Sequence, residues 1–232
     1  MPKVQLSYYS DVLCIWAYIA ERRLRELVET FGERISIDVC YCSVFPDAWG
    51  KIEQKWSESG GFAGFNRHLR EVAEKFPHIE VNERLWLDSR PRTSASAHLF
   101  LKAVEAVEQS RRGVPPADIP YLDRLSTQAA WSLRRAFFAS AKDVSDWRIH
   151  EEISDEIGVD FRTVEEKIRS SEAVLRLATD YERSQSQKVE GSPTFIMNNG
   201  RQKLFGNIGY RLLEANVQEL LRNPRADEAS WC

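Results

Sequence analysis

The chain has 232 residues, of which 43% are hydrophobic and 11% aromatic, and its formal net charge at pH 7 is −3. This length and apolar content suffice for a hydrophobic core, in one domain or in one domain with a large insertion. The near-neutral charge excludes the broad basic surface that attracts nucleic acid or acidic lipid. No apolar run approaches the roughly 20 residues of a membrane-spanning helix, so we expect neither nucleic acid nor a membrane as a partner.

The N-terminal residues lead directly into a strand-like segment, without the apolar region of a secretory leader, which predicts a cytoplasmic protein. The chain contains no C-x-x-C pair and its four histidines are scattered, so we expect no metal site. In a cytoplasmic protein, structural disulfides are rare. We therefore expect the four cysteines to be mostly reduced: Cys14, Cys40, Cys42 and Cys232.

The opening stretch is typical of a β-strand that turns into a helix. Ser10 and Asp11 are residues that cap helices, and apolar residues then recur at helical spacing over residues 17–28. Cys14 is thereby expected in the first helical turn, where free N–H groups and the positive end of the helix dipole stabilise a thiolate. The alternative is that Cys14 is a small buried apolar residue.

A second strand is expected over residues 34–43, after Gly32 ends the first helix. A helix between two strands implies that these strands pair in parallel. Period-two spacing then places Cys40 and Cys42 on one face of the sheet. Because the end of this strand lies at the same edge as the start of the first helix, Cys42 is placed to approach Cys14. The alternative is that both are ordinary strand residues.

The middle of the chain has almost no strand pattern. Residues 45–64 are expected to be loosely structured, with the segment 61–64 as a loop over the site. Beyond it the apolar spacing and the helix start signals predict a series of helices over residues 65–76, 93–109, 119–141, 146–157, 161–170 and 172–187.

A β-hairpin is expected near the C-terminal end, where two short strands flank the turn Asn198-Asn199-Gly200. Pro193 stands at the start of the first of these strands, a place where its missing N–H is not needed. Asn207 is expected to cap a final helix over residues 210–222. The free N–H groups at this corner form a candidate carboxylate site.

Two stretches together resemble the DsbA-like branch of the thioredoxin fold, and within it the FrnE-type proteins: SDVLCIWAYIA near the start and EGSPTF, residues 190–195, near the end. Relatives of that branch include 2-hydroxychromene-2-carboxylate isomerases and kappa-class glutathione transferases. The resemblance extends over nearly the whole chain. It implies an α/β fold, with a thioredoxin-like core and a large all-helical insertion between the second and third strands. The expected domains are residues 1–64 with 188–232 for the core, and residues 65–187 for the insertion.

The resemblance also assigns roles to residues. It implies that the peptide bond before Pro193 is cis and that this proline lies against Cys14. Ser192 and Pro193 would then form the extended platform for a partner, and Trp16 is a candidate wall of the site, although it is as readily a core residue. In glutathione-using relatives the corner at Asn207 holds the γ-glutamyl end of the tripeptide.

One departure from the family pattern bears on the chemistry. Where the family has C-P-W-C, this chain has Cys14-Ile15-Trp16-Ala17, so no disulfide forms within the motif. A mixed disulfide on Cys14 would be resolved by glutathione or by Cys42, or would not be resolved.

The resemblance therefore predicts a DsbA-like thiol–disulfide oxidoreductase that uses one nucleophilic cysteine in a C-x-x-A motif. We expect no tightly bound cofactor and glutathione, or another thiol, as co-substrate. The alternative is a glutathione-dependent isomerase or transferase that acts on a small aromatic or electrophilic substrate. A third hypothesis is a non-enzymatic peptide-binding module. The relatives include monomers and dimers, which makes a homodimer compatible with the family.

Overall fold

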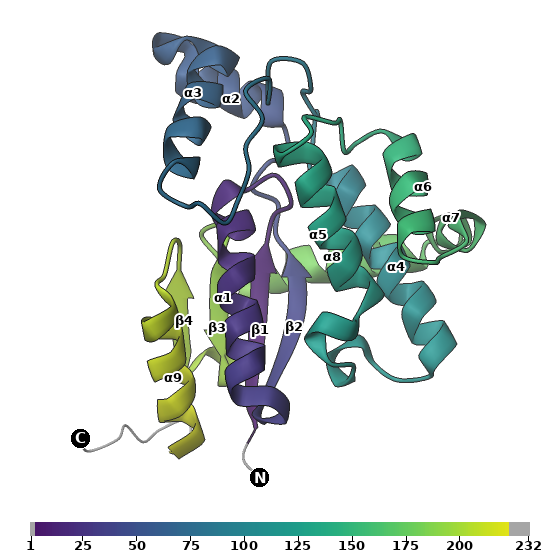
Figure 1. Ribbon diagram of the computed structural model, residues 1–232. Helices are drawn as coiled ribbons and strands as arrows, with labels where there is room; N and C mark the ends of the chain where they lie inside the picture. The colour runs from purple at the N-terminus through teal and green to yellow at the C-terminus, as the bar shows by residue number, and fades with distance from the viewer. Residues whose placement is uncertain (1–2, 223–232) are drawn as a thin grey trace.

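The computed structural model describes residues 3–222, and four strands form one mixed sheet in the order β2-β1-β3-β4 (Figure 1). β1 pairs in parallel with β2 and antiparallel with β3, which pairs antiparallel with β4. The parallel first pair and the C-terminal hairpin confirm the predictions from the sequence. The strands are β1 Val4–Ser10, β2 Ile35–Tyr41, β3 Thr194–Met197 and β4 Gln202–Phe205.

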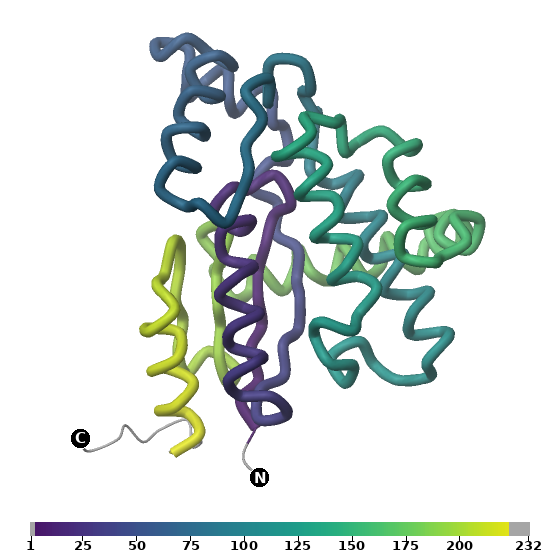
Figure 2. Tube along the Cα trace, in the orientation of Figure 1, coloured from purple at the N-terminus to yellow at the C-terminus, as the bar shows by residue number. Residues whose placement is uncertain are grey.

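Helices cover both faces of this sheet. α1 (Ile15–Phe31) and α9 (Tyr210–Arg222) lie side by side on one face, and α8 (Glu172–Ser186) crosses behind the other (Figures 1 and 2). Alternate β1 residues pack under the two front helices because successive side chains of a strand point to opposite faces. This core includes Val4, Leu6 and Tyr8 of β1, Leu24 and Leu27 of α1, and Leu213 and Val217 of α9.

A long helical region connects β2 to β3. Its second core joins Ile19 of α1 to Leu101 and Leu133 of the inserted helices. Besides α8, the helices of this region are α2 Ala48–Trp56, α3 Gly61–Ala73, α4 Ala95–Arg112, α5 Leu125–Phe138, α6 Trp147–Glu156 and α7 Phe161–Arg169.

Three local expectations for this region were wrong. The segment expected to be loose contains α2, which Asp47 caps by accepting the N–H of Gly50. The expected loop at 61–64 is the start of α3, preceded by the left-handed Gly60. The long helix expected from residue 119 begins only at Leu125, because the preceding segment, with its two prolines at 116 and 120, forms short 3-10 turns.

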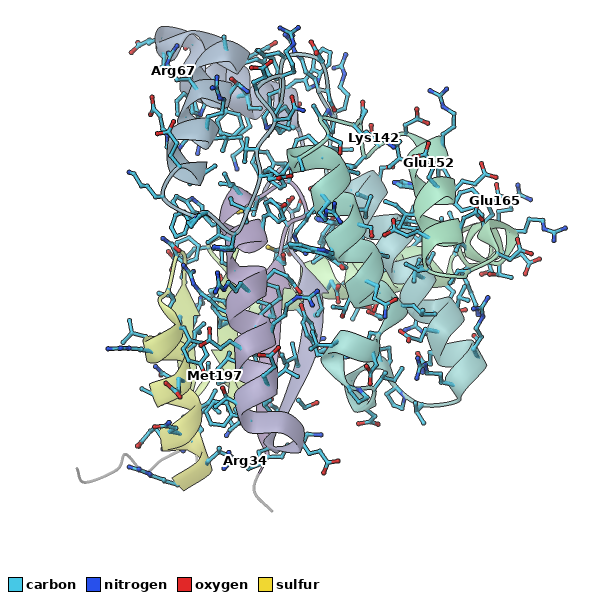
Figure 3. All side chains as sticks on the ribbon, in the orientation of Figure 1. Arg34, Arg67, Lys142, Glu152, Glu165 and Met197 are labelled. Carbon is cyan, nitrogen blue, oxygen red and sulfur yellow. The ribbon has the colours of Figure 1, made fainter. Side chains whose placement is uncertain are left out.

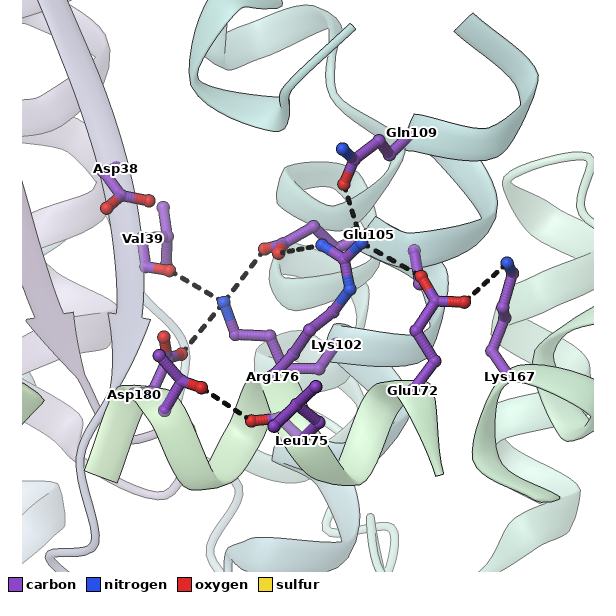
Figure 4. A network of polar contacts seen from close by, with 12 residues as sticks. Asp38, Val39, Lys102, Glu105, Gln109, Lys167, Glu172, Leu175, Arg176 and Asp180 are labelled. Carbon is purple, nitrogen blue, oxygen red and sulfur yellow. Dashed lines mark hydrogen bonds and ion pairs between the residues drawn. The ribbon is translucent and has the colours of Figure 1, made fainter. Parts of the chain in front are cut away.

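A network of buried and half-buried charges holds α4 and α8 against β2 (Figure 4). The Lys102 ammonium donates to the Val39 carbonyl at 3.1 Å and lies 2.9 Å from the Asp180 carboxylate and 3.0 Å from that of Glu105. Arg176 extends the network from α8 to Glu105. The insertion is thereby joined to the sheet by side chains as well as by apolar packing.

Charged side chains extend outward at the periphery of the molecule, among them Arg34, Arg67 and Glu165 (Figure 3). Lys142 and Glu152 form an exposed ion pair at 2.7 Å, whereas Met197 of the central strand β3 is fully buried. Among the helices of residues 3–222, none is long and apolar enough to cross a membrane.

Candidate active site around Cys14

Cys14 stands at the junction between the strand β1 and the helix α1. It is the N-cap residue, with φ −85° and ψ 116°, so it precedes the first helical turn by one residue. Its N–H donates to the Asp11 carbonyl and its own carbonyl accepts the N–H groups of Ala17 and Tyr18, each at 3.1 Å. The sequence-based placement in the first turn is therefore off by one position.

The start of the hairpin lies against this cysteine. The Ser192–Pro193 peptide is cis, as the resemblance implied. The Cys14 thiol donates to the Ser192 carbonyl at 3.1 Å, and the Asp11 N–H donates to Ser192 Oγ at 2.9 Å. Two segments from opposite ends of the chain thus meet at one sulfur.

Several contacts fix the proline segment in place. Thr194 Oγ1 donates to the Gly191 carbonyl at 2.7 Å, and the Gly206 N–H donates to the Pro193 carbonyl at 2.9 Å. The Phe205 ring lies so close to Gly191 that a Cβ on this glycine would be 3.0 Å from it. The absence of a side chain at residue 191 therefore lets an aromatic ring lie directly on the backbone of this segment.

The expected thiolate is not the favoured form of Cys14. Burial raises the pKa of this thiol, and the Asp11 carboxylate adds to the rise, while the N–H groups of Ala17 and Trp16 and the contact with Ser192 lower it. The side chain is only 7% exposed. The prediction from helix position was wrong because desolvation outweighs the helix end once the sulfur is covered.

Asp11 organises the turn that carries Cys14. Its fully buried carboxylate accepts the N–H groups of Leu13, Val44 and Phe45 at 2.9–3.0 Å and the Ser94 hydroxyl at 2.7 Å. These bonds join the turn to the segment after β2 and to the start of α4. The sequence indicated a helix cap at Asp11, but its long-range partners carry no local signal.

His98 supports the same turn from α4. Its Nε2 accepts the Val12 N–H at 3.1 Å, and its ring stacks on Tyr41 at 4.7 Å. Burial lowers the pKa of His98 from 6.5 to about 4, so the ring is neutral and its 3.8 Å approach to Asp11 is not an ion pair at neutral pH. His98 is thus a packed helix residue whose neutral ring holds the turn in place.

Cys40 and Cys42 share one face of the sheet, as period-two spacing predicted, where both pack with Tyr9 and Ile196. The Cys42 thiol lies 4.0 Å from the Gly191 carbonyl, one residue before the carbonyl that Cys14 contacts. Cys14, Cys40 and Cys42 are free thiols. Burial raises the pKa of Cys42, and the charge of Asp11 adds to this rise. Cys232 lies outside the described residues.

The other predicted site residues lie around this centre with different contacts. Trp16 is half-buried, packs on the core and meets Phe76 edge-on at 6.2 Å. Ala17, which replaces the second cysteine of the motif, is fully buried. Asn207 is exposed beside the Gly206 corner, but it does not cap α9, because the first bonds of that helix reach the Gly209 carbonyl.

Comparisons with known proteins agree with this geometry. Residues 121–218 match the family model of the DSBA-like thioredoxin domain. The chain has a DsbA-like thioredoxin fold, and this part of it is similar to the DSBA-like family. Its matched part extends from the inserted helices through the proline segment into α9. No curated protein sequence matches the chain.

Solved structures share the fold over nearly the whole chain. A candidate protein disulfide isomerase from Nitrosomonas europaea is 14% identical with a TM-score of 0.73, covering 95% of this chain and 98% of the other. The cytosolic disulfide reductase DsbM from Pseudomonas aeruginosa is 18% identical with a TM-score of 0.66, covering 92% and 98%. A 2-hydroxychromene-2-carboxylate isomerase is 17% identical with a TM-score of 0.62, covering 97% and 100%. At such identities the likeness concerns the fold.

Proposed function

We propose that this DsbA-like protein catalyses thiol–disulfide exchange through the single thiol of Cys14, with glutathione or a related small thiol as co-substrate. The observation that carries the proposal is the position of the Cys14 sulfur, 3.1 Å from the Ser192 carbonyl beside the cis-proline. The disulfide reductase DsbM shares the fold and has also been solved with glutathione, which supports this choice of chemistry.

Exchange at this site has two balanced steps. The Cys14 thiol loses its proton to solvent, and the thiolate attacks a disulfide, forming a mixed disulfide and releasing one thiolate. Ala17 contributes no sulfur, so the second thiol is glutathione or Cys42, whose side chain lies against the same proline segment. Glutathione attacks the partner's sulfur, takes the partner group as a new disulfide and restores the Cys14 thiol. Cys42 attacks the Cys14 sulfur, releases the partner thiol and forms a Cys14–Cys42 disulfide, which two further glutathione molecules reduce. Ser192 and Pro193 would hold the partner, and Trp16 and Asn207 would lie at its margins.

Substitution of Cys14 tests the proposal. The wild-type protein is expected to form a mixed disulfide with oxidised glutathione, detected by intact mass, whereas Cys14→Ser forms none at this position. Peptide mapping assigns the modified cysteine and shows whether a Cys14–Cys42 disulfide follows. Modification of other cysteines alone, with Cys14 unmodified, would refute the proposal.

A glutathione-dependent isomerase or transferase is the second candidate. It is favoured by the protonated state of Cys14, because a thiol that donates a hydrogen bond stabilises a glutathione thiolate without reacting itself. Under this function Cys14→Ser retains a hydrogen-bond donor at residue 14 and keeps the activity. Cys14→Ala has no such donor and loses the activity. Under exchange chemistry both variants are inactive.

A cytoplasmic location belongs to the same proposal. DsbM is described as cytosolic, and free buried thiols at residues 14, 40 and 42 suit a reducing compartment. Fractionation of cells that express the full-length chain tests the location directly.

A further inference from the structure

A cleft of about 470 Å³ opens beside the proline segment, on the side of Cys42. Its walls come from four parts of the chain: the segment after β2, the helix α2, the helix α8, and the residues that lead into the cis-proline. The charged residues of the lining are Lys51 and Glu190, and Cys42, Tyr181 and Gly191 lie beside them. This size suits a small ligand. Gly191 directly precedes Ser192, so a ligand in the cleft lies next to the segment that contacts the Cys14 sulfur.

Lys51 of α2 places a half-buried positive charge in this cleft. Its ammonium donates to the Val44 carbonyl at 2.6 Å and lies 4.5 Å from the centre of the Phe45 ring. Since an ammonium has three N–H groups, donors remain for an oxygen of a ligand. Burial lowers the pKa of Lys51, with a smaller contribution from Lys55, and the Asp11 carboxylate opposes this.

Tyr181 of α8 adds a directed hydrogen-bond donor. Because His98 Nε2 accepts the Val12 N–H, the ring proton of this neutral histidine is assigned to Nδ1, which faces the Tyr181 hydroxyl at 3.4 Å. The Tyr181 hydroxyl thus accepts a hydrogen bond from His98, and its own proton points away from this histidine. Ser43, on the cleft wall, hydrogen-bonds with it, and burial raises the pKa of Tyr181, which keeps the phenol protonated.

An ammonium and a phenol on the walls of one cleft form a site for a carboxylate. We propose that the cleft recognises the carboxylate of a small disulfide or thiol, with Lys51 as the specificity-determining residue and Tyr181 as a second donor. This inference rests on the proposed thiol exchange and names its substrate class. In the step concerned, the Cys14 thiol and a disulfide RSSR give the mixed disulfide Cys14–S–SR and RSH.

Disulfides of different charge test the inference. The rate of mixed-disulfide formation on Cys14 is measured by intact mass with oxidised glutathione, neutral bis(2-hydroxyethyl) disulfide and cationic cystamine. Lys51→Gln is expected to slow the reaction with oxidised glutathione roughly tenfold, the loss typical of one charge-assisted hydrogen bond. The neutral disulfide should react at the wild-type rate, and cystamine at the same rate or faster. Lys51→Arg should restore most of the rate with oxidised glutathione.

Lys55→Gln is the matched control, because Lys55 is an exposed lysine one turn further along α2. It should leave all three rates within about twofold of the wild type, within the small effect of an exposed charge. Tyr181→Phe should slow only the reaction with oxidised glutathione, by a few-fold. Far-UV circular dichroism verifies that each variant is folded.

A measurement without exchange chemistry separates this inference from the proposed function. S-methylglutathione, which has the carboxylates but no free thiol, should bind the wild type and bind Lys51→Gln about tenfold more weakly by calorimetry. If Cys14 reacts with no disulfide while this Lys51-dependent binding persists, thiol exchange is wrong and the cleft assignment stands. If Lys51→Gln slows all disulfides equally, slows none, or binds S-methylglutathione like the wild type, the cleft assignment is wrong.

Discussion

Two opposing effects act on the thiol of Cys14. Its place at the amino end of α1 favours the thiolate, which is the effect that the sequence shows. Burial and the charge of Asp11 favour the thiol, and they prevail. Cys14 is therefore a protonated thiol in the resting protein, and it becomes a nucleophile only when it loses its proton during the reaction.

The pH dependence of alkylation reports this balance. Because the pKa of Cys14 is raised, we expect its reaction with iodoacetamide to be slow at neutral pH and to increase with pH beyond the range in which an ordinary cysteine is already ionised. Peptide mapping separates Cys14 from the other cysteines, and the protein unfolded in guanidinium provides the ordinary profile. If Cys14 in the folded protein reached its half-maximal rate at the same pH as in the unfolded protein, or at a lower pH, the expectation would be wrong.

His98 makes stability depend on pH. The unfolded chain binds a proton on this residue below about pH 6.5, whereas the folded protein does so only near pH 4. Protonation of His98 therefore has no effect on stability above pH 6.5. As the pH decreases from 6.5 to 4, it lowers the free energy of unfolding by about 3 kcal/mol. Urea unfolding of the wild type and of His98→Gln at a series of pH values should show this difference growing toward low pH. A constant difference would contradict it.

The difference between the two proteins is needed because Asp180 titrates in the same range. Burial raises the pKa of this carboxyl to about 6, so its contribution to stability falls as the pH rises through that value. The sign is opposite to that of His98. Subtracting the curve of His98→Gln from that of the wild type removes the Asp180 contribution.

Among the secondary-structure elements, β2 lies at the edge of the sheet, yet several backbone groups on its outer side have hydrogen-bond partners. Lys102 donates to the Val39 carbonyl (Figure 4). Arg124 donates to the Ile37 carbonyl at 2.6 Å, and Asp180 accepts the Tyr41 N–H at 2.8 Å. Side chains of the insertion thus satisfy backbone groups that another strand would otherwise pair with.

Arg124→Met tests the contribution of this edge. The buried guanidinium also donates to the Ile119 carbonyl at 2.8 Å, so its loss leaves at least two buried carbonyls without a donor. We expect the free energy of unfolding to fall by about 3 kcal/mol. Arg135→Met, an exposed change on α5, the helix that follows Arg124, should have little effect. Equal stability of the two variants in urea unfolding would show that the edge contacts contribute little.

At the scale of the whole molecule, the main apolar core contains residues of both the thioredoxin-like part and the helical insertion. One cluster contains Ile19 of α1 together with Leu69, Leu101 and Leu133 of three inserted helices. The thioredoxin-like core and the helical insertion were predicted as two domains, and that division stays a prediction. A shared core favours joint unfolding.

We therefore expect one cooperative thermal transition. Scanning calorimetry should show a single peak, and far-UV circular dichroism and tryptophan fluorescence should report the same midpoint. Two separate transitions would show that the insertion unfolds independently of the sheet in spite of the shared core.

The elements with strong local patterns were predictable. The alternation in β1 and β2, Gly32 at the end of α1 and the Asn-Gly turn of the hairpin are each determined within a few residues. The start of α2 was not, because its helix depends on the Asp47 cap and on the burial of Ala48 and Ile52 against distant residues.

In the site, the helix-start pattern indicated Cys14, and the family resemblance indicated Ser192 and Pro193. It did not indicate Lys51, His98 or Tyr181 as parts of the same region, since each is an ordinary member of a helical pattern. Their proximity arises only when α2, α4 and α8 fold back onto the end of β2.

The sequence by itself determined the order of strands and helices, the single cysteine at the start of α1 and the loss of its usual partner at Ala17. The tertiary structure decided the protonation of that cysteine, the bonds of Asp11 and the cleft beside Cys42. The physical reason is that residue spacing encodes local backbone preferences, whereas desolvation and charge depend on what covers a group. That covering comes from segments far away in the chain.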